Sequence, residues 1–414
     1  MGVIFVVHEA SKLGFTNGHP DWSNLGQGQP EVGEMAGAPP RIASVEIRPE
    51  DHAYGPLGGT PELRERIAAH YNRLFRKGKR SQYTAANVCV AQGGRLALTR
   101  AVAALGETQI GYPLPDYTAY EDMLALHLSR ISPIPLRGRP EDGFQVPVSR
   151  LAREVEHSGL GAILLSNPCN PTGNVIQGKE LAALVALARE RSLTLLLDEF
   201  YSHFIYTPKG APGKGPVSGA AHVEDVEHEP VVLIDGLTKS FRYPGWRVGW
   251  AVGPSPMMET LARVASSIDG GPSRIAQRAA LQVLEPERAD QETRALRQVF
   301  AAKRNVMVER LKSMGIRFAK EPEGTFYCWC SLEELAPPFN DAMTFFRRAL
   351  EHKVLTVPGE FFDVNPGKRR RGRSPYHQWM RFSFGPTMDN MNQGLDRLER
   401  MLAGGRTGSK RSRR

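Results

Sequence analysis

Short, almost continuously apolar segments alternate with helical patterns from about residue 60 onward, and this alternation most constrains the fold. Apolar residues recur at helical spacing after Thr60 and Pro61, an N-cap followed by proline at the first helical position. Strands that are apolar on both faces and alternate with helices predict an α/β protein with a mostly parallel central sheet, covered by helices on both faces. Five segments are predicted as strands: Val88–Ala91, Ala162–Ser166, Thr194–Phe200, Val231–Asp235 and Arg247–Val252.

The length of the chain and a late change of pattern predict two domains. The 414 residues exceed the size at which a single hydrophobic core usually stops growing. From about Pro286 a long charged helical pattern leads into a second α/β pattern. The expected division is an N-terminal arm that joins the small domain (1–50), a large domain (51–286), a small C-terminal domain (287–403) and a basic disordered tail (404–414).

One segment inside the expected large domain has no periodicity. Residues 207–229 are rich in proline and glycine, which indicates either a lid or a floppy insertion.

The net charge of +9 comes from two short segments. Residues 368–373 (KRRRGR) and the tail 404–414 contain five basic residues each and no acid, and the rest of the chain is close to neutral. A basic loop or tail is more often solvated than bound to a polyanion. We therefore expect no specific nucleic-acid partner.

The sequence favours neither a membrane protein nor a metal-binding protein. No apolar stretch approaches the roughly 20 residues of a membrane span, and the apolar run Val3–Val7 has no basic segment before it, unlike a secretory signal. The four cysteines lack the spacing of a disulfide framework or a zinc site. We expect a cytoplasmic protein with reduced thiols, no metal and no membrane contact.

In an open α/β sheet, ligands bind beyond the carboxyl ends of the strands. Gly93, Gly94 and Arg95 follow the first predicted strand and open a helix, where free backbone N–H groups and the helix dipole can hold a phosphate. Asn170 lies in the loop SNPCNPTG, which its prolines make rigid. These positions predict an anion site beside a polar loop.

Three charged residues also lie at or near strand ends, and together they suit pyridoxal phosphate chemistry. Lys239 follows the fourth predicted strand and supplies the amine that forms a Schiff base with an aldehyde. Asp198 ends an apolar strand and can keep a pyridine nitrogen protonated, so that the ring accepts electrons. Arg381, in WMRFSF, is a planar bidentate donor suited to an α-carboxylate. The neighbouring Glu199 is interpreted as a helix cap or a surface acid.

Four segments in order, AYGPLGGTPELRERIA, SNPCNPTG, LLLDEFYSHFIY and GLTKSFRYPGWRVGW, resemble the class I/II aminotransferases. These are pyridoxal-phosphate enzymes of fold type I, of the aspartate aminotransferase type. The resemblance runs from Leu25–Glu31 (LGQGQPE) to Arg381–Gly385 (RFSFG). It implies a homodimer that moves the amino group of an L-amino acid to a 2-oxo acid by a ping-pong mechanism.

The resemblance also implies roles for individual residues. Lys239 would bond covalently to the cofactor and then carry the proton as general base and acid. Tyr117 would stack on the pyridine ring, with Tyr120 as the competing candidate. The substrate would be bound by Gly28, Asn170 and Arg381. The cofactor would be bound by Gly93, Gly94, Arg95, Tyr117, Asn170, Asp198, Tyr201, Thr238 and Arg247, and by Tyr54 of the partner subunit.

The chain departs from the family pattern at two positions. Gly236 stands where a hydroxyl residue commonly contacts the phosphate, although Thr238 keeps a hydroxyl nearby. Arg95 stands where a small or hydroxyl residue is common, so it either supplies charge to the site or points away as a surface arginine. His203 is expected to be structural.

Two questions stay open at the level of the sequence. The same residues also serve other fold type I reactions on amino acids, so a β-lyase or a biosynthetic oxidase or cyclase is the alternative to an aminotransferase. The donor and acceptor side chains are read by variable loops, and the sequence does not identify them.

Overall fold

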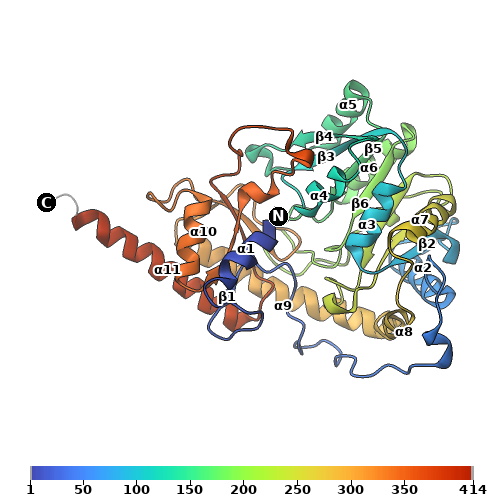
Figure 1. The fold of residues 1–414 in the computed structure, drawn as a ribbon, viewed down its shortest axis with the longest axis horizontal. Coiled ribbons are helices and arrows are strands. Elements are labelled where there is room, and N and C mark those ends of the chain that lie inside the picture. Colours follow the sequence, from blue (N-terminus) through green and yellow to red (C-terminus); the bar gives the residue numbers. More distant parts are fainter. Residues whose placement is uncertain (1, 412–414) are drawn as a thin grey trace.

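The computed structural model describes residues 2–411, with the backbone alone described for 405–411. Its centre is a seven-stranded sheet in the order β2-β8-β7-β6-β5-β3-β4 (Figure 1). Only β8 runs antiparallel to its neighbours, and every other pair is parallel. The predicted α/β class with a mostly parallel sheet is confirmed. The strands are β2 (Val88–Ala91), β3 (Thr108–Leu114), β4 (Ile131–Arg137), β5 (Ala162–Ser166), β6 (Thr194–Asp198), β7 (Val231–Gly236) and β8 (Gly249–Val252).

The strand predictions differ from the structure in three main respects. Strand β6 ends at Asp198, two residues before its predicted end at Phe200. Strands β3 and β4 were not predicted, because prolines interrupt their apolar residues (TQIGYPL and ISPIPLR). Proline is tolerated in β4 because it is the edge strand of the sheet. Strand β8 begins at Gly249 rather than Arg247, since Arg247 has a left-handed backbone conformation (φ 54°) that ends the preceding turn.

Both faces of this sheet are buried, which is why its strands are apolar throughout. Successive residues of one strand belong to different cores: Leu196 packs in one core and Leu197 in the other. The first core contains residues of α3 (Gly94–Ala103), α4 (Ala119–Ala125) and α7 (Ser255–Ile268). The second contains residues of α2 (Pro61–Phe75), α5 (Val148–Ser158), α6 (Gly178–Glu190) and α8 (Arg274–Val283).

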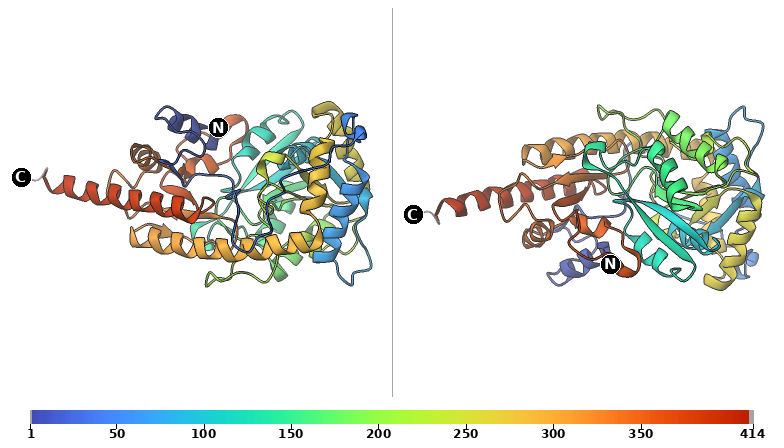
Figure 2. Two further views of the ribbon diagram at one scale, coloured as in Figure 1. Left: turned by 90° about the horizontal axis from the view of Figure 1, so that it is seen from below. Right: turned by 90° about the horizontal axis from the view of Figure 1, so that it is seen from above.

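A second, antiparallel sheet lies in the C-terminal part, in the order β12-β13-β10-β9. Strand β1 (Ser23–Asn24) pairs with β11 (Val354–Leu355), so the N-terminal segment joins this part. The long helix α9 (Pro286–Ser313) reaches from one sheet to the other (Figure 2). The domain boundaries stay a prediction. The remaining elements are α1 (Gly2–Ser11), β9 (Arg317–Phe318), β10 (Tyr327–Ser331), α10 (Ala342–Glu351), β12 (Val357–Pro358) and β13 (Trp379–Ser383).

Residues 207–229 form a packed connection rather than a lid or a floppy insertion. Ala220, Val223 and Val226 are buried in the second core. The buried Arg76 donates to the carbonyl oxygens of Ala220 (2.9 Å) and Val223 (2.8 Å). Side-chain hydrogen bonds to the backbone therefore replace regular secondary structure here, which the lack of sequence periodicity could not reveal.

The predicted basic tail (404–414) overlaps the end of the last helix, and its expected disorder stays a prediction. Helix α11 (Met388–Arg411) continues through residues 404–411 and projects from the body of the molecule (Figure 1). Its first half is anchored by buried Met391, Leu395 and Leu398, and extending an established helix costs little per residue. Residues 412–414 of the expected tail lie outside the described residues. Within residues 2–411, no helix has the length and apolar composition needed to cross a membrane.

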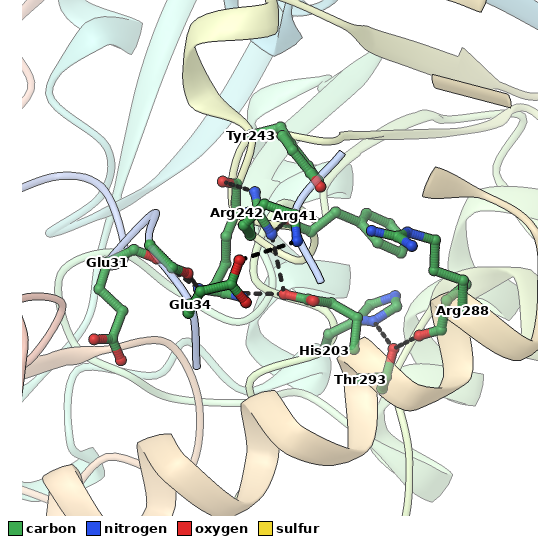
Figure 3. A network of polar contacts seen from close by, with 12 residues as sticks. Glu31, Glu34, Arg41, His203, Arg242, Tyr243, Arg288 and Thr293 are labelled. Carbon is green, nitrogen blue, oxygen red and sulfur yellow. Dashed lines mark hydrogen bonds and ion pairs between the residues drawn. The ribbon is translucent and has the colours of Figure 1, made fainter. Parts of the chain in front are cut away.

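Buried polar contacts tie the N-terminal arm to the loop after β7 (Figure 3). The fully buried Arg242 donates from Nε to Glu292 (2.6 Å) and from Nη1 to the carbonyl oxygens of Glu31 (3.1 Å) and Gly33 (2.8 Å). Arg41 of the arm in turn donates to the carbonyl oxygen of Arg242 (2.7 Å). The loop that carries Lys239 is therefore fixed to the arm.

Replacing Arg242 with methionine should destabilise the protein, because Glu292 would keep only the more distant Arg41 (3.8 Å) as a cationic partner. We expect the free energy of unfolding, measured in urea, to fall by about 3 kcal/mol. The matched control is Arg73→Met at the exposed pair Arg73–Asp290 (2.8 Å), which should cost less than about 1 kcal/mol. Equal losses in the two variants would contradict this account of the arm.

Candidate active site

The carboxyl ends of the central parallel strands bring polar residues to one edge of the sheet. Ser166 ends β5 opposite Asp198, which ends β6, and Asp198 lies opposite Ile234 of β7. A cavity of about 670 Å³ opens at this edge. Most of the predicted site residues line it together: Gly28, Gly94, Arg95, Tyr117, Asn170, Asp198, Tyr201, Thr238, Lys239, Arg247 and Arg381.

Lys239 lies in the loop after β7, and its Nζ donates to the carbonyl oxygen of Gly28. Burial, together with the positive charges of Arg381 and Arg247, lowers the pKa of Lys239 to about 7. A substantial fraction of this amine is therefore unprotonated at neutral pH. The unprotonated form is the one that attacks a carbonyl carbon.

Asp198 lines the cavity and is only 4% exposed. Burial raises the pKa of Asp198 to about 6, and the hydroxyl of Tyr120 donates to its Oδ2 (2.8 Å). A cation beside this carboxyl would favour its charged form and lower its pKa. Asp198 can therefore hold a protonated ring nitrogen.

The two tyrosines that competed for ring stacking have different surroundings. Tyr117 lines the cavity, whereas Tyr120 is fully buried and does not. Their rings meet edge to face with centroids 5.5 Å apart. This supports Tyr117 as the stacking residue and leaves Tyr120 as the hydrogen-bond partner of Asp198. No local sequence signal indicates this role of Tyr120, because Asp198 lies 78 residues further along the chain.

Arg381 reaches the cavity from β13 and is only 2% exposed. Its Nη1 donates to Oδ1 of Asn170 (2.9 Å), its Nη2 donates to the carbonyl oxygen of Gly26 (2.9 Å), and its Nε has no partner. The guanidinium lies 4.0 Å from the ring centroid of Tyr327. A buried guanidinium with an unpaired donor suits an incoming carboxylate.

Tyr327 is a residue of the cavity that the sequence did not indicate. Its hydroxyl shares a hydrogen bond with that of Tyr201 (2.9 Å), and both tyrosines line the cavity. Tyr327 lies in β10, and no motif surrounds it. The predicted contacts of Tyr201 and Asn170 with the cofactor stay predictions.

The predicted phosphate site at Gly93 and Gly94, called the phosphate cradle below, has the required shape and charge. Helix α3 begins at Gly94, with Gly93 as its N-cap in a positive-φ conformation (86°). A Cβ added to Gly93 would lie 2.3 Å from Nη2 of Arg247, and one added to Gly94 would lie 1.7 Å from Phe200. The glycines let a guanidinium approach a helix N-terminus closely, where both favour an anion. The residues present therefore fit the phosphate of pyridoxal phosphate.

The absence of a hydroxyl residue at Gly236 has a steric cause. A Cβ at this position would lie 2.6 Å from the carbonyl oxygen of Val248 and 2.7 Å from Cα of Gly249. The close pairing of β7 and β8 therefore excludes any side chain. The hydroxyl residue Thr238 does line the cavity.

Two alternatives were open for Arg95: it supplies charge to the site, or it points away as a surface arginine. The structure supports the first, because Arg95 lines the cavity. Its Nη2 lies 3.4 Å from the hydroxyl of Tyr117, to which it donates. The hydroxyl and the nearby Asp122 raise the pKa of Arg95, which stays charged.

The interpretation of Glu199 as a helix cap or surface acid was wrong. Glu199 is 1% exposed and accepts hydrogen bonds from Oγ of Ser218 (2.6 Å) and N of Gly219 (2.7 Å). Residues 207–229 fold over it, a long-range contact that the local sequence does not encode. His203 is buried outside the cavity and hydrogen-bonded to Thr293 (2.9 Å), in keeping with a structural role.

Two of the predicted cofactor contacts, Gly93 and Tyr54, do not line this cavity: Gly93 adjoins the lining residue Gly94, whereas Tyr54 lies elsewhere. The side chain of Tyr54 is 100% exposed. Its assignment to the site of a partner subunit stays a prediction.

The amine of Lys239 should react at lower pH than an ordinary lysine. We expect arylation of Lys239 by trinitrobenzenesulfonate in the cofactor-free protein to rise with a midpoint near pH 7, because the neutral amine is the nucleophile. Arylation of the exposed Lys179 in the same sample, followed by peptide mass spectrometry, is the internal control and should rise near the usual lysine pKa of about 10.4. Coincident curves for the two lysines would contradict the effect of burial on Lys239.

The comparisons with known proteins agree with this geometry. The chain is 28% identical over 353 residues to an aspartate/prephenate aminotransferase of Thermus thermophilus (84% of this chain, 83% of the relative). It is 27% identical over 393 residues to an aspartate aminotransferase of Bacillus subtilis (93% of this chain, 92% of the relative). A solved Thermus thermophilus aspartate aminotransferase with maleate superposes with a TM-score of 0.78 at 25% identity, covering 97% of this chain and 96% of that one.

The Aminotransferase class I and II family profile matches residues 20–398, which include every strand of both sheets. Together with the amine, acid, guanidinium and phosphate cradle around one cavity, this match determines the class of enzyme. The chain belongs to the class I and II aminotransferases and is a pyridoxal-phosphate-dependent transferase of fold type I.

Proposed function

We propose that the residues around this cavity carry out amino transfer from an L-amino acid to a 2-oxo acid, with Lys239 at the centre of the reaction. The observation that carries the proposal is the placement of an amine with a pKa near 7 in one cavity with Asp198 and Arg381. Pyridoxal phosphate, when bound, supplies an aldehyde that takes up the amino group and a ring that draws electrons from the substrate Cα.

The chain's own residues would hold the cofactor at both ends. Arg247 and the N-terminus of α3 bind its phosphate, and Asp198 binds the ring nitrogen. Tyr117 packs against the ring face. Asn170 and Tyr201 donate to its phenolic oxygen.

The substrate would be held and deprotonated by two residues. Arg381 binds the α-carboxylate through the edge of its guanidinium that carries the unpartnered Nε. With the cofactor bound, the free amine of Lys239 would remove the proton from the substrate Cα and would deliver it to the cofactor carbon that carries the amino nitrogen. A pKa near 7 suits this double role, because both protonation states are populated at neutral pH.

A side chain with a second carboxylate is the donor class we propose. Arg247 and Arg381 are assigned to the phosphate and the α-carboxylate, which leaves Arg95 as a further cation in the cavity wall. The relatives named aspartate aminotransferases support an acidic donor. A β-lyase would instead release ammonia and an oxo acid from a single donor.

A cytoplasmic homodimer is the assembly we propose. Tyr54, which is fully exposed in the single chain, would complete the phosphate site of the partner. The four cysteines are unpaired, as in a reducing compartment.

Lys239→Ala should lower the rate of amino transfer from aspartate to 2-oxoglutarate by at least about 10²-fold, since it removes the general base. Borohydride reduction should fix the cofactor to the wild-type protein but not to this variant. Lys179→Ala, at an exposed lysine, is the control and should behave as wild type. If borohydride still fixed the cofactor to the Lys239→Ala variant, the assignment of Lys239 as the residue that bonds covalently to the cofactor would be wrong.

Arg95→Gln should raise the KM for aspartate about tenfold, the loss expected for one charge-assisted hydrogen bond. The KM for alanine should change less than about twofold, because its side chain carries no charge. Steady-state kinetics with both donors would check this. An equal rise for the two donors would assign Arg95 to the cofactor phosphate instead of the substrate.

A further inference from the structure

Asp116 is a buried acid behind the cavity to which no role has been given. It follows β3 and is 1% exposed. Its Oδ1 accepts hydrogen bonds from the backbone N–H of Tyr117 (2.7 Å) and the hydroxyl of Ser166 (2.5 Å), and its Oδ2 accepts from the N–H of Ser166 (3.3 Å). One carboxyl group therefore joins the end of β3 to the end of β5.

The chain of contacts continues from Ser166 to the substrate arginine. The hydroxyl of Ser166 accepts a hydrogen bond from the backbone N–H of Asn170 (3.1 Å). Oδ1 of Asn170 accepts from Arg381 (2.9 Å). Tyr117 is thus connected through Asp116 and Ser166 to the Asn170–Arg381 pair.

The electrostatics are compatible with a carboxyl group in this place. Burial, reinforced by the negative charge of Asp198, raises the pKa of Asp116 to about 8. Asp116 is therefore mostly neutral at pH 7. A second buried anion beside Asp198 is avoided while the hydrogen bonds to Tyr117 and Ser166 are kept.

We propose that Asp116 is a positioning residue that holds the stacking ring of Tyr117 and the Asn170–Arg381 pair at a fixed separation. The inference rests on the roles proposed above for Tyr117, Asn170 and Arg381. Its physical basis is that Asp116 satisfies three buried donors at once, which an apolar side chain would leave without partners. Small displacements of binding groups lower the rate of a reaction that depends on their alignment.

The test compares Asp116→Ala with Asp116→Asn in the complete enzyme. Two quantities are measured: the Kd of pyridoxal phosphate, by titrating it into the cofactor-free protein, and the KM for 2-oxoglutarate. Asp116→Ala should raise each about tenfold, because the alanine accepts none of the three hydrogen bonds. Asp116→Asn should restore both to within about threefold of wild type, since its amide oxygen still accepts from Ser166 and Tyr117.

Glu199→Ala is the matched control. Glu199 is an equally buried carboxyl that accepts from a serine hydroxyl and a backbone N–H, but it does not line the cavity. Its loss should lower Tm about as much as Asp116→Ala does, without changing the Kd or the KM by more than about twofold. If Asp116→Ala also left both quantities within twofold, Asp116 would be structural only and the proposal wrong.

Ser166→Ala covers the case in which Asp116→Ala does not fold. This variant breaks the connection to Asn170 while leaving the contact between Asp116 and Tyr117, so the KM for 2-oxoglutarate should rise more than the Kd of pyridoxal phosphate. An unchanged KM would overturn the proposal. These outcomes are independent of the borohydride experiment on Lys239, so failure of this inference and failure of the proposed function can be told apart.

Discussion

Removal of ionisable groups from water at one edge of the sheet is the constraint on which the site depends. The same burial lowers the pKa of Lys239 and raises that of Asp198, so the amine is poised to react and the acid is poised to accept a cation. Such desolvation costs free energy. It is offset by two apolar cores that bury both faces of the sheet and by hydrogen bonds that hold each charged group in place.

Close approach of backbone segments is the second condition for this site. Glycine at 93 and 94 lets Arg247 and Phe200 reach the start of α3, and glycine at 236 lets β7 and β8 pair closely. At each of these positions the absence of a side chain lets another group come closer. The hydroxyl residue expected at position 236 is missing for this reason, and the cationic Arg247 beside the helix N-terminus is the principal feature available to a phosphate.

Segments from opposite ends of the chain complete the cavity. Gly28 of the N-terminal arm accepts from Lys239, while Arg381 comes from the second sheet. Arg242 fixes the arm to the lysine loop through Glu31 and Gly33, and Lys303 of α9 pairs with Glu31 (2.6 Å). The inferred connection through Asp116 would add a link between Tyr117 and the Asn170–Arg381 pair. The geometry of the site is thus a property of the assembled molecule rather than of any one loop.

The sequence by itself determined the mostly parallel sheet and singled out Lys239, Asp198, Asn170 and Arg381 as site candidates, because apolar strands and the polar residues in or just after them are local patterns. Other features depended on contacts between segments distant in the chain, and only the tertiary structure decided them. Strands β3 and β4 are stabilised by their neighbours despite their prolines. The burial of Glu199 under residues 207–229 and the contacts of Tyr120, Tyr327 and Asp116 arise where separate strand ends meet. The local periodicity of the sequence carries no information about these contacts, because hydrogen bonds and packing across the sheet depend on strand order and register.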